Sequence, residues 1–316
     1  MITGLLLAGC SSDKDNPPPS VVPSASAPVP SVSPTTPTSF QPEPTVGAAV
    51  DADVLAGVKL SGKPGSLPTF EFTPPLIVSG GVARVALAGT GDVVALGDAV
   101  LLDLATVSGA DGTALGDSYS GIPEMEVVNE DNFPPALLEV LVGERVGARL
   151  LFATPNDEGG AHLSAFEILS TQKVLELAEG TTNEPTAGLP VVTLAEDGLP
   201  SLKPTDQPPP TELVAQPLIT GTGKTLTADA WFAFHYTSWL WDGREVDTSW
   251  DGSPLVQLMT DAQPGWQEGL IGQKVGSRVL VVMPPGAFDS AELEHIPAGS
   301  TLVFAIDILT AINPAV

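Results

Sequence analysis

The residues that most often carry out chemistry in proteins are few and widely spaced in this sequence. There is a single cysteine, Cys10, and the three histidines, His162, His235 and His295, lie far apart along the chain. No group of Cys, His, Asp and Glu residues has metal-ligand spacing. There is neither a phosphate-binding Gly-Lys loop nor a Gly-x-Ser-x-Gly turn. We therefore expect no metal or other cofactor and no conventional hydrolytic, redox or phosphoryl-transfer machinery.

The composition limits the partners that this chain can have. Its 316 residues include 12 Lys and Arg against 38 Asp and Glu, a formal net charge of -26. Nucleic-acid binding depends on basic side chains that meet phosphates, so no nucleic acid is expected as a partner. Hydrophobic residues make up 43% of the chain, which is enough for folded cores. The 32 glycines and 32 prolines favour short strands and turns over long helices.

The N-terminal region has the features of a lipid attachment site. Leu7-Ala8-Gly9-Cys10 resembles a bacterial lipobox, in which a cysteine is diacylated after cleavage of the bond before it. We interpret residues 1–10 as a lipoprotein signal, and expect translation to start upstream because no basic segment precedes the short apolar run. Residues 11–46 are rich in Pro, Ser and Thr and predict an extended, disordered tether. The resemblance implies a protein held by lipid on the outer face of the cell membrane.

The rest of the chain contains the same pattern twice. The Gly-Thr-Gly sequence at 89–91 recurs at 221–223, and the Asp-Gly pair at 111–112 recurs at 242–243. From Gly97 to Gly121 the two copies align without a gap at an offset of 131 residues, which pairs Gly97 with Ala228. We interpret this pattern as a tandem duplication. Residues 47–176 form a first domain, 177–188 a linker and 189–316 a second domain.

Each copy contains short runs that are typical of antiparallel strands. The runs at 100–104, 149–153, 231–235 and 278–283 are β-prone and are bounded by Asp-Gly or Pro-Gly turn signals. The segments 134–142 and 265–271, just before Gly143 and Gly272, are each long enough for about two helical turns. This arrangement predicts an α+β fold in which an antiparallel sheet curls over one short helix in each domain.

The second copy carries a longer series of motifs. His235-Tyr236-Thr237 is followed by the Asp-Gly pair, by Val-Asp-Thr-Ser at 246–249, by Gly-Trp-Gln-Glu-Gly-Leu-Ile-Gly at 265–272 and by Leu-Val-Phe at 302–304. In this order, from about Thr220 to Ile312, they resemble the FKBP-type peptidyl-prolyl cis-trans isomerases. The resemblance implies two FKBP-like domains, with proline-containing peptides and unfolded protein clients as partners. A tandem arrangement behind a lipobox also resembles extracytoplasmic lipoproteins of that family.

The resemblance assigns roles to five residues of the second copy. Trp266 would form the floor of a pocket under the substrate proline ring. Tyr236 and Phe304 would be its walls, and Ile296 would close one side. Asp247 would place a carboxylate at the rim, near the reacting carbonyl group. By contrast, we expect the nearby Phe232, Phe234 and Leu302 to be ordinary core residues.

Other positions of the implied pocket depart from the family pattern. The backbone N–H of Gln263, where an isoleucine is usual, would bind a substrate carbonyl, and Ala262 beside it belongs to the same substrate-binding set. Phe288 stands where a tyrosine is usual, and Val246 and Leu255 stand where phenylalanines are. Loss of one neutral hydrogen bond is worth about 0.5–1.5 kcal/mol. We therefore expect a slower or narrower enzyme, with a wider pocket beside the proline site.

The reaction implied by the resemblance needs no nucleophile, metal or proton transfer. Rotation about an X-Pro bond faces a barrier of roughly 18–20 kcal/mol because the planar amide is stabilised by resonance. Unaided isomerisation takes tens to hundreds of seconds. An enzyme need only bind the twisted amide better than the planar one, and an apolar pocket can do so because the twisted amide has lost part of its polar character.

The first copy lacks the residues to which the resemblance assigns these roles. The alignment places Leu137 at the position of Trp266, Ala105 at that of Tyr236 and Gly116 at that of Asp247, and all five tryptophans lie in the second half. We expect this domain to be inactive and to serve in spacing or client binding. Two alternatives to an isomerase remain open: a non-catalytic chaperone or interaction module, and a ligand-capturing surface lipoprotein supported only by the anchor.

Overall fold

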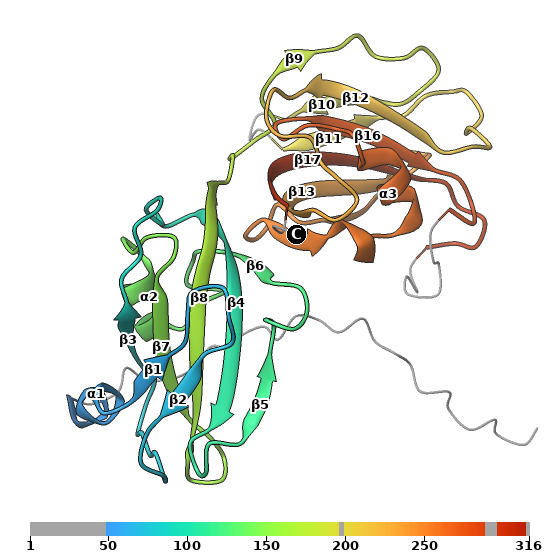
Figure 1. Ribbon diagram of the computed structural model, residues 1–316. Helices are drawn as coiled ribbons and strands as arrows, with labels where there is room; N and C mark the ends of the chain where they lie inside the picture. The colour runs from blue at the N-terminus through green and yellow to red at the C-terminus, as the bar shows by residue number, and fades with distance from the viewer. Residues whose placement is uncertain (1–48, 196–198, 288–295, 314–316) are drawn as a thin grey trace, which may run out of the picture. The chain divides into compact units, whose positions relative to one another are not determined.

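The computed structural model describes residues 49–195, 199–287 and 296–313 (Figure 1). The predicted lipid attachment residue Cys10, the tether at 11–46 and the predicted site residue Phe288 lie outside these ranges. Within the ranges, no helix combines the length and the hydropathy that crossing a lipid bilayer requires.

The first copy folds into a six-stranded antiparallel sheet with α2 (Pro135–Leu141) packed against it. The strands run in the order β3-β7-β8-β4-β5, and β6 also pairs with β4. A helix, α1, and a separate β1–β2 hairpin precede the sheet (Figure 1). The bounds are α1 Ala49–Ala56, β1 Lys59–Ser61, β2 Thr69–Glu71, β3 Val82–Leu87, β4 Asp98–Ser108, β5 Ala114–Asp117, β6 Glu124–Val127, β7 Arg149–Pro155 and β8 Ala161–Lys173.

The second copy repeats this arrangement with α3 (Pro264–Leu270) in place of α2. Its seven-stranded sheet has the order β14-β13-β17-β16-β12-β9, and β15 also pairs with β13. A separate β10–β11 hairpin lies between β9 and β12 in the chain. The bounds are β9 Thr181–Thr182, β10 Val191–Leu194, β11 Pro200–Lys203, β12 Val214–Thr220, β13 Trp231–Leu240, β14 Glu245–Thr248, β15 Leu255–Leu258, the 3-10 turn η1 Met259–Asp261, β16 Arg278–Met283 and β17 Leu302–Ile312.

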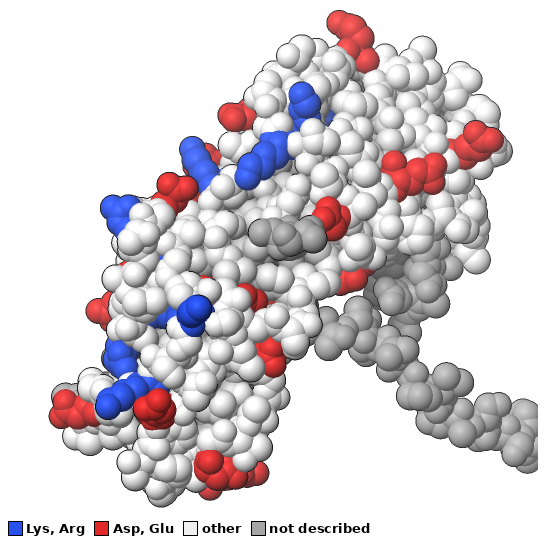
Figure 2. Space-filling view, viewed as in Figure 1, with Lys and Arg blue, Asp and Glu red and all other residues white. Residues whose placement is uncertain are grey.

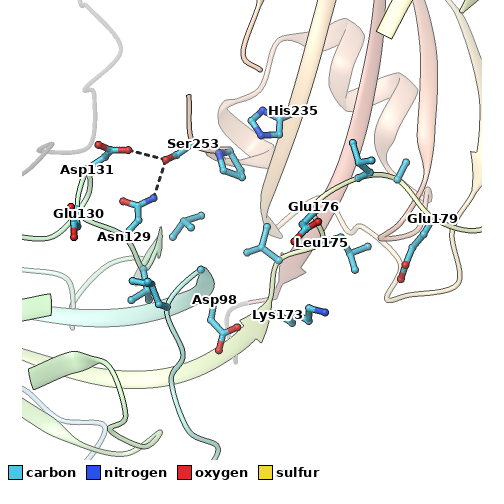
Figure 3. A pocket seen from close by; sticks show the side chains of 18 residues that line it. Asp98, Asn129, Glu130, Asp131, Lys173, Leu175, Glu176, Glu179, His235 and Ser253 are labelled. Carbon is cyan, nitrogen blue, oxygen red and sulfur yellow. Dashed lines mark hydrogen bonds between the residues drawn. The ribbon is translucent and has the colours of Figure 1, made fainter. Parts of the chain in front are cut away.

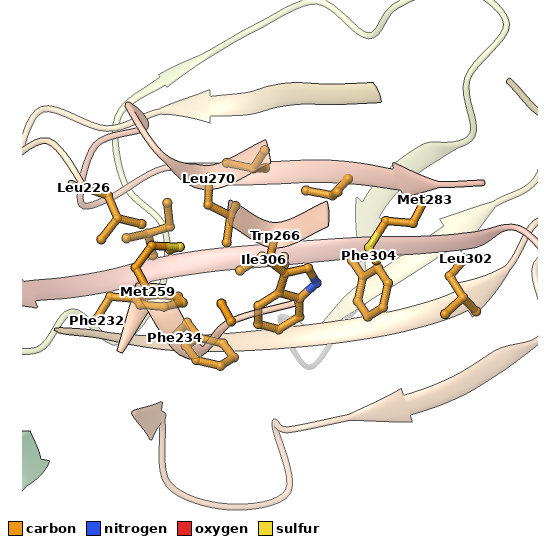
Figure 4. Packing of buried hydrophobic residues seen from close by; sticks show 14 of the residues in the cluster. Leu226, Phe232, Phe234, Met259, Trp266, Leu270, Met283, Leu302, Phe304 and Ile306 are labelled. Atoms are coloured by element: carbon orange, nitrogen blue, oxygen red, sulfur yellow. The ribbon is translucent and has the colours of Figure 1, made fainter. Parts of the chain in front are cut away.

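Each sheet buries one face against its short helix. In the second copy Phe232, Phe234 and Ile306 of the sheet meet Trp266 and Leu270 of α3, as Figure 4 shows. The first copy has the same kind of core, built from the side chains of Leu102, Phe166, Ile168, Leu137 and Leu141. Burial of one such side chain stabilises a fold by about 1.5–3 kcal/mol. The predicted sheet with a short helix on one face is therefore confirmed for both copies.

The opposite face of each sheet is covered by a hairpin that the sequence did not predict. In the first copy Leu60 and Phe70 of the β1–β2 hairpin pack with Leu151 and Leu163 of the sheet. In the second copy the partners of Leu280, Val282 and Val303 include hairpin residues. Those residues are Val192 of β10 and Leu202 of β11. The duplicated unit thus contains a hairpin on one face of the sheet as well as the helix on the other.

The strand register corrects the gap-free alignment of the two copies. Arg149 pairs with Glu167 in the first sheet as Arg278 pairs with Asp307 in the second. In the first copy Phe166, the residue before Glu167, pairs with Leu104. In the second copy Ile306, the residue before Asp307, pairs with Tyr236. Leu104, and not Ala105, therefore stands at the position of Tyr236. The cause is one extra residue in the β4–β5 turn of the first copy. There the Ser108 amide donates to the Thr113 carbonyl, five residues on, whereas in the second copy the Leu240 amide donates to the Arg244 carbonyl, four residues on.

Part of the predicted linker at 177–188 belongs to the second sheet. Strand β9 pairs with the end of β12, and the Glu179 amide donates to the Gly276 carbonyl (2.8 Å). The Ala178 amide donates to Oδ2 of Asp307 (2.8 Å). Backbone hydrogen bonds and the Asp307 carboxylate hold this segment, so it needs no hydrophobic pattern. Its sequence therefore resembles that of a free loop.

Charged side chains are sparse on the face of the molecule shown in Figure 2. Lys and Arg side chains lie among Asp and Glu side chains there, with uncharged surface between them. The viewed face therefore has no large region of one charge, in spite of the net charge of -26 for the whole sequence.

A buried ion pair lies at the equivalent position of each sheet. In the second copy Nε and Nη2 of Arg278 donate to Oδ1 and Oδ2 of Asp307 at 2.6 and 2.7 Å. In the first copy Arg149 pairs with Glu167 at 2.7 Å, and both side chains are almost fully buried. A two-point Arg-carboxylate contact fixes orientation as well as distance. The Arg278–Asp307 pair therefore fastens β16 to β17 and, through the Ala178 amide, the segment that precedes β9.

We expect the Asp307→Ala variant to lose about 3–5 kcal/mol of folding free energy, because the Arg278 guanidinium would remain buried without its partner. Urea unfolding followed by circular dichroism measures this loss. The matched control is Glu268→Ala, which removes an exposed carboxylate from α3 and should change stability by less than about 0.5 kcal/mol. Equal unfolding midpoints for the two variants would contradict the structural importance of the pair.

Candidate functional site

A pocket of about 250 Å³ opens on the helix-facing side of the second sheet. Strands β13, β14, β15 and β17, the N-terminal end of α3 and Ile296 in the segment before β17 supply its lining. Apolar and aromatic side chains make up most of it, with a few polar ones at its edge. The lining residues are Phe234, Tyr236, Ser238, Val246, Asp247, Leu255, Gln257, Gln263, Trp266, Ile296, Leu302 and Phe304.

The indole of Trp266 forms the floor of this pocket and is only 8% exposed. Its ring stands almost perpendicular to those of Phe234 and Phe304, at angles of 84° and centroid distances of 5.1 and 5.6 Å. It meets Tyr236 at 5.6 Å and 72°. Each edge-to-face pair adds about 0.5–1.5 kcal/mol beyond its buried area. Three such contacts hold the indole in one orientation, and Figure 4 shows it beside Phe234 and Phe304.

Local sequence places Trp266 where the sheet can receive it. Pro264 occupies the first turn of α3, a position at which the missing N–H costs nothing. Gly265 faces β16 so closely that a Cβ atom would lie 2.8 Å from Cε of Met283. The glycine therefore lets the helix approach the sheet, and the next residue is directed into the pocket.

Tyr236 and Asp247 form a hydrogen-bonded pair at the rim of the pocket. The Tyr236 hydroxyl donates to Oδ2 of Asp247, whose side chain is otherwise exposed. Burial raises the pKa of the Tyr236 phenol, and the hydrogen bond and negative charge of Asp247 raise it further. The phenol therefore stays protonated at neutral pH and remains a donor, which holds the carboxylate at the pocket edge.

Gln263, the N-cap residue of α3, also lines the pocket. Its carbonyl accepts from the Trp266 and Gln267 amides (2.8 and 3.1 Å), and its backbone angles are φ −56° and ψ 146°. Among the described residues, none of the hydrogen bonds found uses the Gln263 amide as donor. This group can therefore bind an incoming carbonyl oxygen.

The structure brings together eight of the residues that the sequence predicted for the site. Ala262 is the exception among those described: it is buried in the core, and its carbonyl accepts from the Gln267 side chain (2.7 Å). Phe288 lies outside the described residues. The predicted residues that line the pocket are Tyr236, Val246, Asp247, Leu255, Gln263, Trp266, Ile296 and Phe304.

Four lining residues were not predicted for the site. Phe234 and Leu302, which we expected only in the core, reach the pocket as well, whereas Phe232 is fully buried in the core as expected. Ser238 and Gln257 were missed. Strand alternation could have found both, because Ser238 follows Tyr236, and Gln257 follows Leu255, by two residues.

His235 faces away from this pocket, because neighbouring strand residues point to opposite sides of a sheet. Its ring stacks on Trp250 at 4.2 Å, and Nδ1 lies 3.0 Å from Oγ of Ser249. Burial lowers the pKa of His235, although the charge of Asp307 acts in the opposite direction. The ring is therefore neutral at pH 7 and belongs to the other face of the sheet.

His235 contributes instead to a larger and more polar cavity of about 1110 Å³, drawn in Figure 3. Ser253 there accepts from Nδ2 of Asn129 (3.1 Å) and donates to Oδ2 of Asp131 (2.9 Å). Glu130, Glu176 and Lys173 also line it. Its described lining contains no Phe, Tyr or Trp, so it offers no apolar floor for a proline ring.

The first copy has lost the pocket residues while keeping the strands that carried them. At the start of α2, Pro134 occupies the position of Gln263, with nearly the same backbone angles. A proline has no N–H, so the first copy lacks the backbone amide that Gln263 has at this position. The other replacements, taken from the strand register and the helix alignment, are Leu137 for Trp266, Leu104 for Tyr236, Gly116 for Asp247 and Ser164 for Phe304.

Comparisons with known proteins agree with these observations. The family model described as "FKBP-type peptidyl-prolyl cis-trans isomerase" matches residues 223–309. A probable FK506-binding protein of Corynebacterium glutamicum is 36% identical over 107 residues, which are 33% of this chain and 91% of that protein. The isomerase FkpA of Buchnera aphidicola is 37% identical over 95 residues, 29% of this chain and 39% of that protein.

The chain thus spans about two fifths of the FkpA relative's length but most of the Corynebacterium protein. Among solved structures, the crystal structure of FkpA from Escherichia coli is 31% identical, with a TM-score of 0.31. That match covers 40% of this chain and 53% of the other.

The pocket geometry predicts separable effects for its floor and its rim. Trp266→Ala should cost about 3–5 kcal/mol of stability, because a buried indole is removed. Asp247→Ala removes an exposed side chain, so folding should change little while kcat/KM for X-Pro rotation in a short peptide falls about tenfold or more. A tenfold fall equals about 1.4 kcal/mol, close to the lower end of the roughly 1.5–3 kcal/mol that a hydrogen bond to a charged group contributes.

The measurement is a proline-isomerisation assay at matched folded fraction. Asp251→Ala is the matched control, because Asp251 is also an exposed aspartate near β14 but does not line the pocket. Unchanged activity in Asp247→Ala would refute a role for that carboxylate.

Proposed function

This chain belongs to the FKBP-type peptidyl-prolyl cis-trans isomerase family, and we propose that its second copy catalyses cis-trans rotation about X-Pro bonds in proteins that fold outside the cytoplasmic membrane. The observation that carries the proposal is the apolar pocket over Trp266. Its floor is held by three aromatic rings, and a phenol-carboxylate pair and a free backbone amide lie at its edge. These groups match a reaction that needs a dry surface and few polar contacts.

In the proposed mechanism the substrate proline ring lies on the indole of Trp266, between Tyr236 and Phe304. The Gln263 amide binds a substrate carbonyl and so fixes the position of the peptide. The X-Pro amide then rotates at the mouth of the pocket, beside Asp247. A twisted amide has lost its resonance and part of its polarity, so the apolar walls bind it better than they bind the planar form. Each tenfold in rate requires about 1.4 kcal/mol of this preference.

We propose that the first copy does not catalyse this reaction and serves instead in client binding or spacing. Pro134 supplies no amide, and Leu137 and Leu104 replace the aromatic floor and wall. A chaperone or interaction module without catalysis is the alternative for the whole protein. It is favoured by Leu255, a lining residue that is 44% exposed and stands where the resemblance implies a bulkier aromatic side chain.

The experiment that tests the proposal divides the chain into residues 47–173 and 174–316. The cut lies before Leu175 because its amide donates to the Leu309 carbonyl (3.1 Å) and the following segment joins the second sheet. The 174–316 fragment should retain essentially all the peptide isomerase activity of the soluble protein, and the 47–173 fragment should have none. Client binding by the first copy could still raise activity on unfolded proteins by increasing their effective concentration.

A full-length variant that carries Trp266→Leu and Asp247→Gly is the matched control, because it gives the second copy two of the pocket residues of the first. It should lose activity while the first copy remains intact. Turnover by the 47–173 fragment would overturn this division. A folded second copy that binds proline peptides without accelerating their isomerisation would support the interaction module instead.

We also propose that Cys10 is diacylated and anchors the mature protein to the outer face of the membrane. The support is Leu7-Ala8-Gly9-Cys10 followed by the Pro/Ser/Thr-rich stretch. Stable anchoring takes more than one acyl chain, and diacylation supplies two. Cys10→Ser should release the protein or leave its precursor uncleaved, as seen by membrane fractionation and mass. A mature Cys10→Ser protein that fractionates with membranes like the wild type would exclude this anchor.

A further inference from the structure

Asp247 reaches the pocket because of an irregularity in its strand. Neighbouring strand residues normally point to opposite faces, yet both Val246 and Asp247 line the pocket. The register shows why: Asp247 pairs with Ser238 but Glu245 pairs with Trp239, so Val246 is an extra residue, a β-bulge. Bulges redirect side chains and commonly lie beside active sites. The position of the carboxylate therefore depends on the turn that joins β13 to β14 and sets this register.

That turn is held from outside by the β10–β11 hairpin and the loop 204–207 after it. The Trp241 indole N–H donates to the Gln207 carbonyl (2.9 Å). Its ring packs in the cluster that contains the hairpin residues Val192 and Leu202. At Gly243, whose φ is +89°, a Cβ atom would lie 3.1 Å from Cγ of Pro204. The turn and the loop are thus in close contact at two of the four turn residues.

The same contact recurs in the first copy. Gly112, the equivalent of Gly243, has the Phe72 ring as the nearest neighbour of its missing Cβ atom, at 3.8 Å. Phe72 follows β2 directly and packs in the hairpin-side cluster of that copy. The matched family segment begins only at residue 223, so the β10–β11 hairpin lies outside it.

We propose that the β10–β11 hairpin is a positioning element for Asp247, and that Trp241 is the residue through which it acts. Held by the hairpin, the turn keeps the bulge at Val246 and the hydrogen bond from Tyr236 to Asp247. The effect on catalysis rests on the isomerase function proposed above, whereas the effect on the position of Asp247 does not. No hairpin residue need contact the substrate.

The test is a double-mutant cycle in the full-length protein. Trp241→Phe removes the indole N–H and should lower kcat/KM for a short proline peptide about three- to tenfold at matched folded fraction. In an Asp247→Ala background the same change should have less than about a twofold effect, because the carboxylate it positions is already gone. The matched control is Trp231→Phe, which removes another indole donor, to the Pro123 carbonyl, at the opposite end of β13. It should leave the activity unchanged.

A second readout needs no activity. The chain has two tyrosines, so Tyr119→Phe leaves Tyr236 as the single source of a ¹³Cζ tyrosine NMR signal. Trp241→Phe should move this signal towards its position in Asp247→Ala, whereas Trp231→Phe should not. An unmoved signal, or an equal loss of activity in both Asp247 backgrounds, would overturn the proposal. An inactive wild type with the expected NMR shifts would leave the positioning role standing and remove the isomerase function instead.

Discussion

The edge-to-face contacts of the Trp266 indole are the interaction on which the second copy depends. A catalyst with no nucleophile or metal can act only through surfaces that bind the transition state better than the ground state. Such surfaces must be rigid, because a surface that changed shape to fit both states would bind them equally well. Phe234, Tyr236 and Phe304 meet the indole from separate strand positions, so none of the four rings can turn without displacing another. The fold supplies this rigidity through two paired strands, β13 and β17, which carry the three partner rings.

The first copy shows which features of the fold are independent of that pocket. It keeps the Arg149–Glu167 ion pair, and Ser118 bonds to the backbone of Leu104 as Ser249 does to that of Tyr236. It has lost the aromatic rings, the carboxylate and the free amide. The retained residues connect strands to one another, whereas the residues that differ are the counterparts of those that line the pocket over Trp266. Stability and pocket chemistry therefore rest on separate sets of residues, which allowed one copy to change its pocket without losing its sheet.

The four runs that the sequence predicted as strands lie within β4, β7, β13 and β16, and the two predicted helical segments overlap α2 and α3, because these hydrophobic runs are continuous and bounded by turn signals. Strand β16 has the predicted bounds, and α3 begins one residue earlier than predicted. Eight pocket residues followed from the ordered motifs. The position of Leu104 was missed because one extra turn residue shifts the register without any change in hydrophobic pattern. The hairpins were missed because their strands are only three or four residues long and lie among prolines and glycines.

The Ser249 hydroxyl joins the two faces of the second sheet. Its Oγ accepts from the Tyr236 amide (2.9 Å) and lies 3.0 Å from Nδ1 of His235, which points to the opposite face. The Ser249 amide in turn donates to the Tyr236 carbonyl (3.0 Å). Tyr236 is therefore held through its backbone by Ser249, directly after β14, and its hydroxyl holds Asp247, two residues earlier in the chain. Because these bonds close a ring between the two strands, a shift of β14 in either direction would break at least one of them. The pocket wall and the rim carboxylate consequently keep one fixed relation, which is the condition that a preorganised apolar site requires.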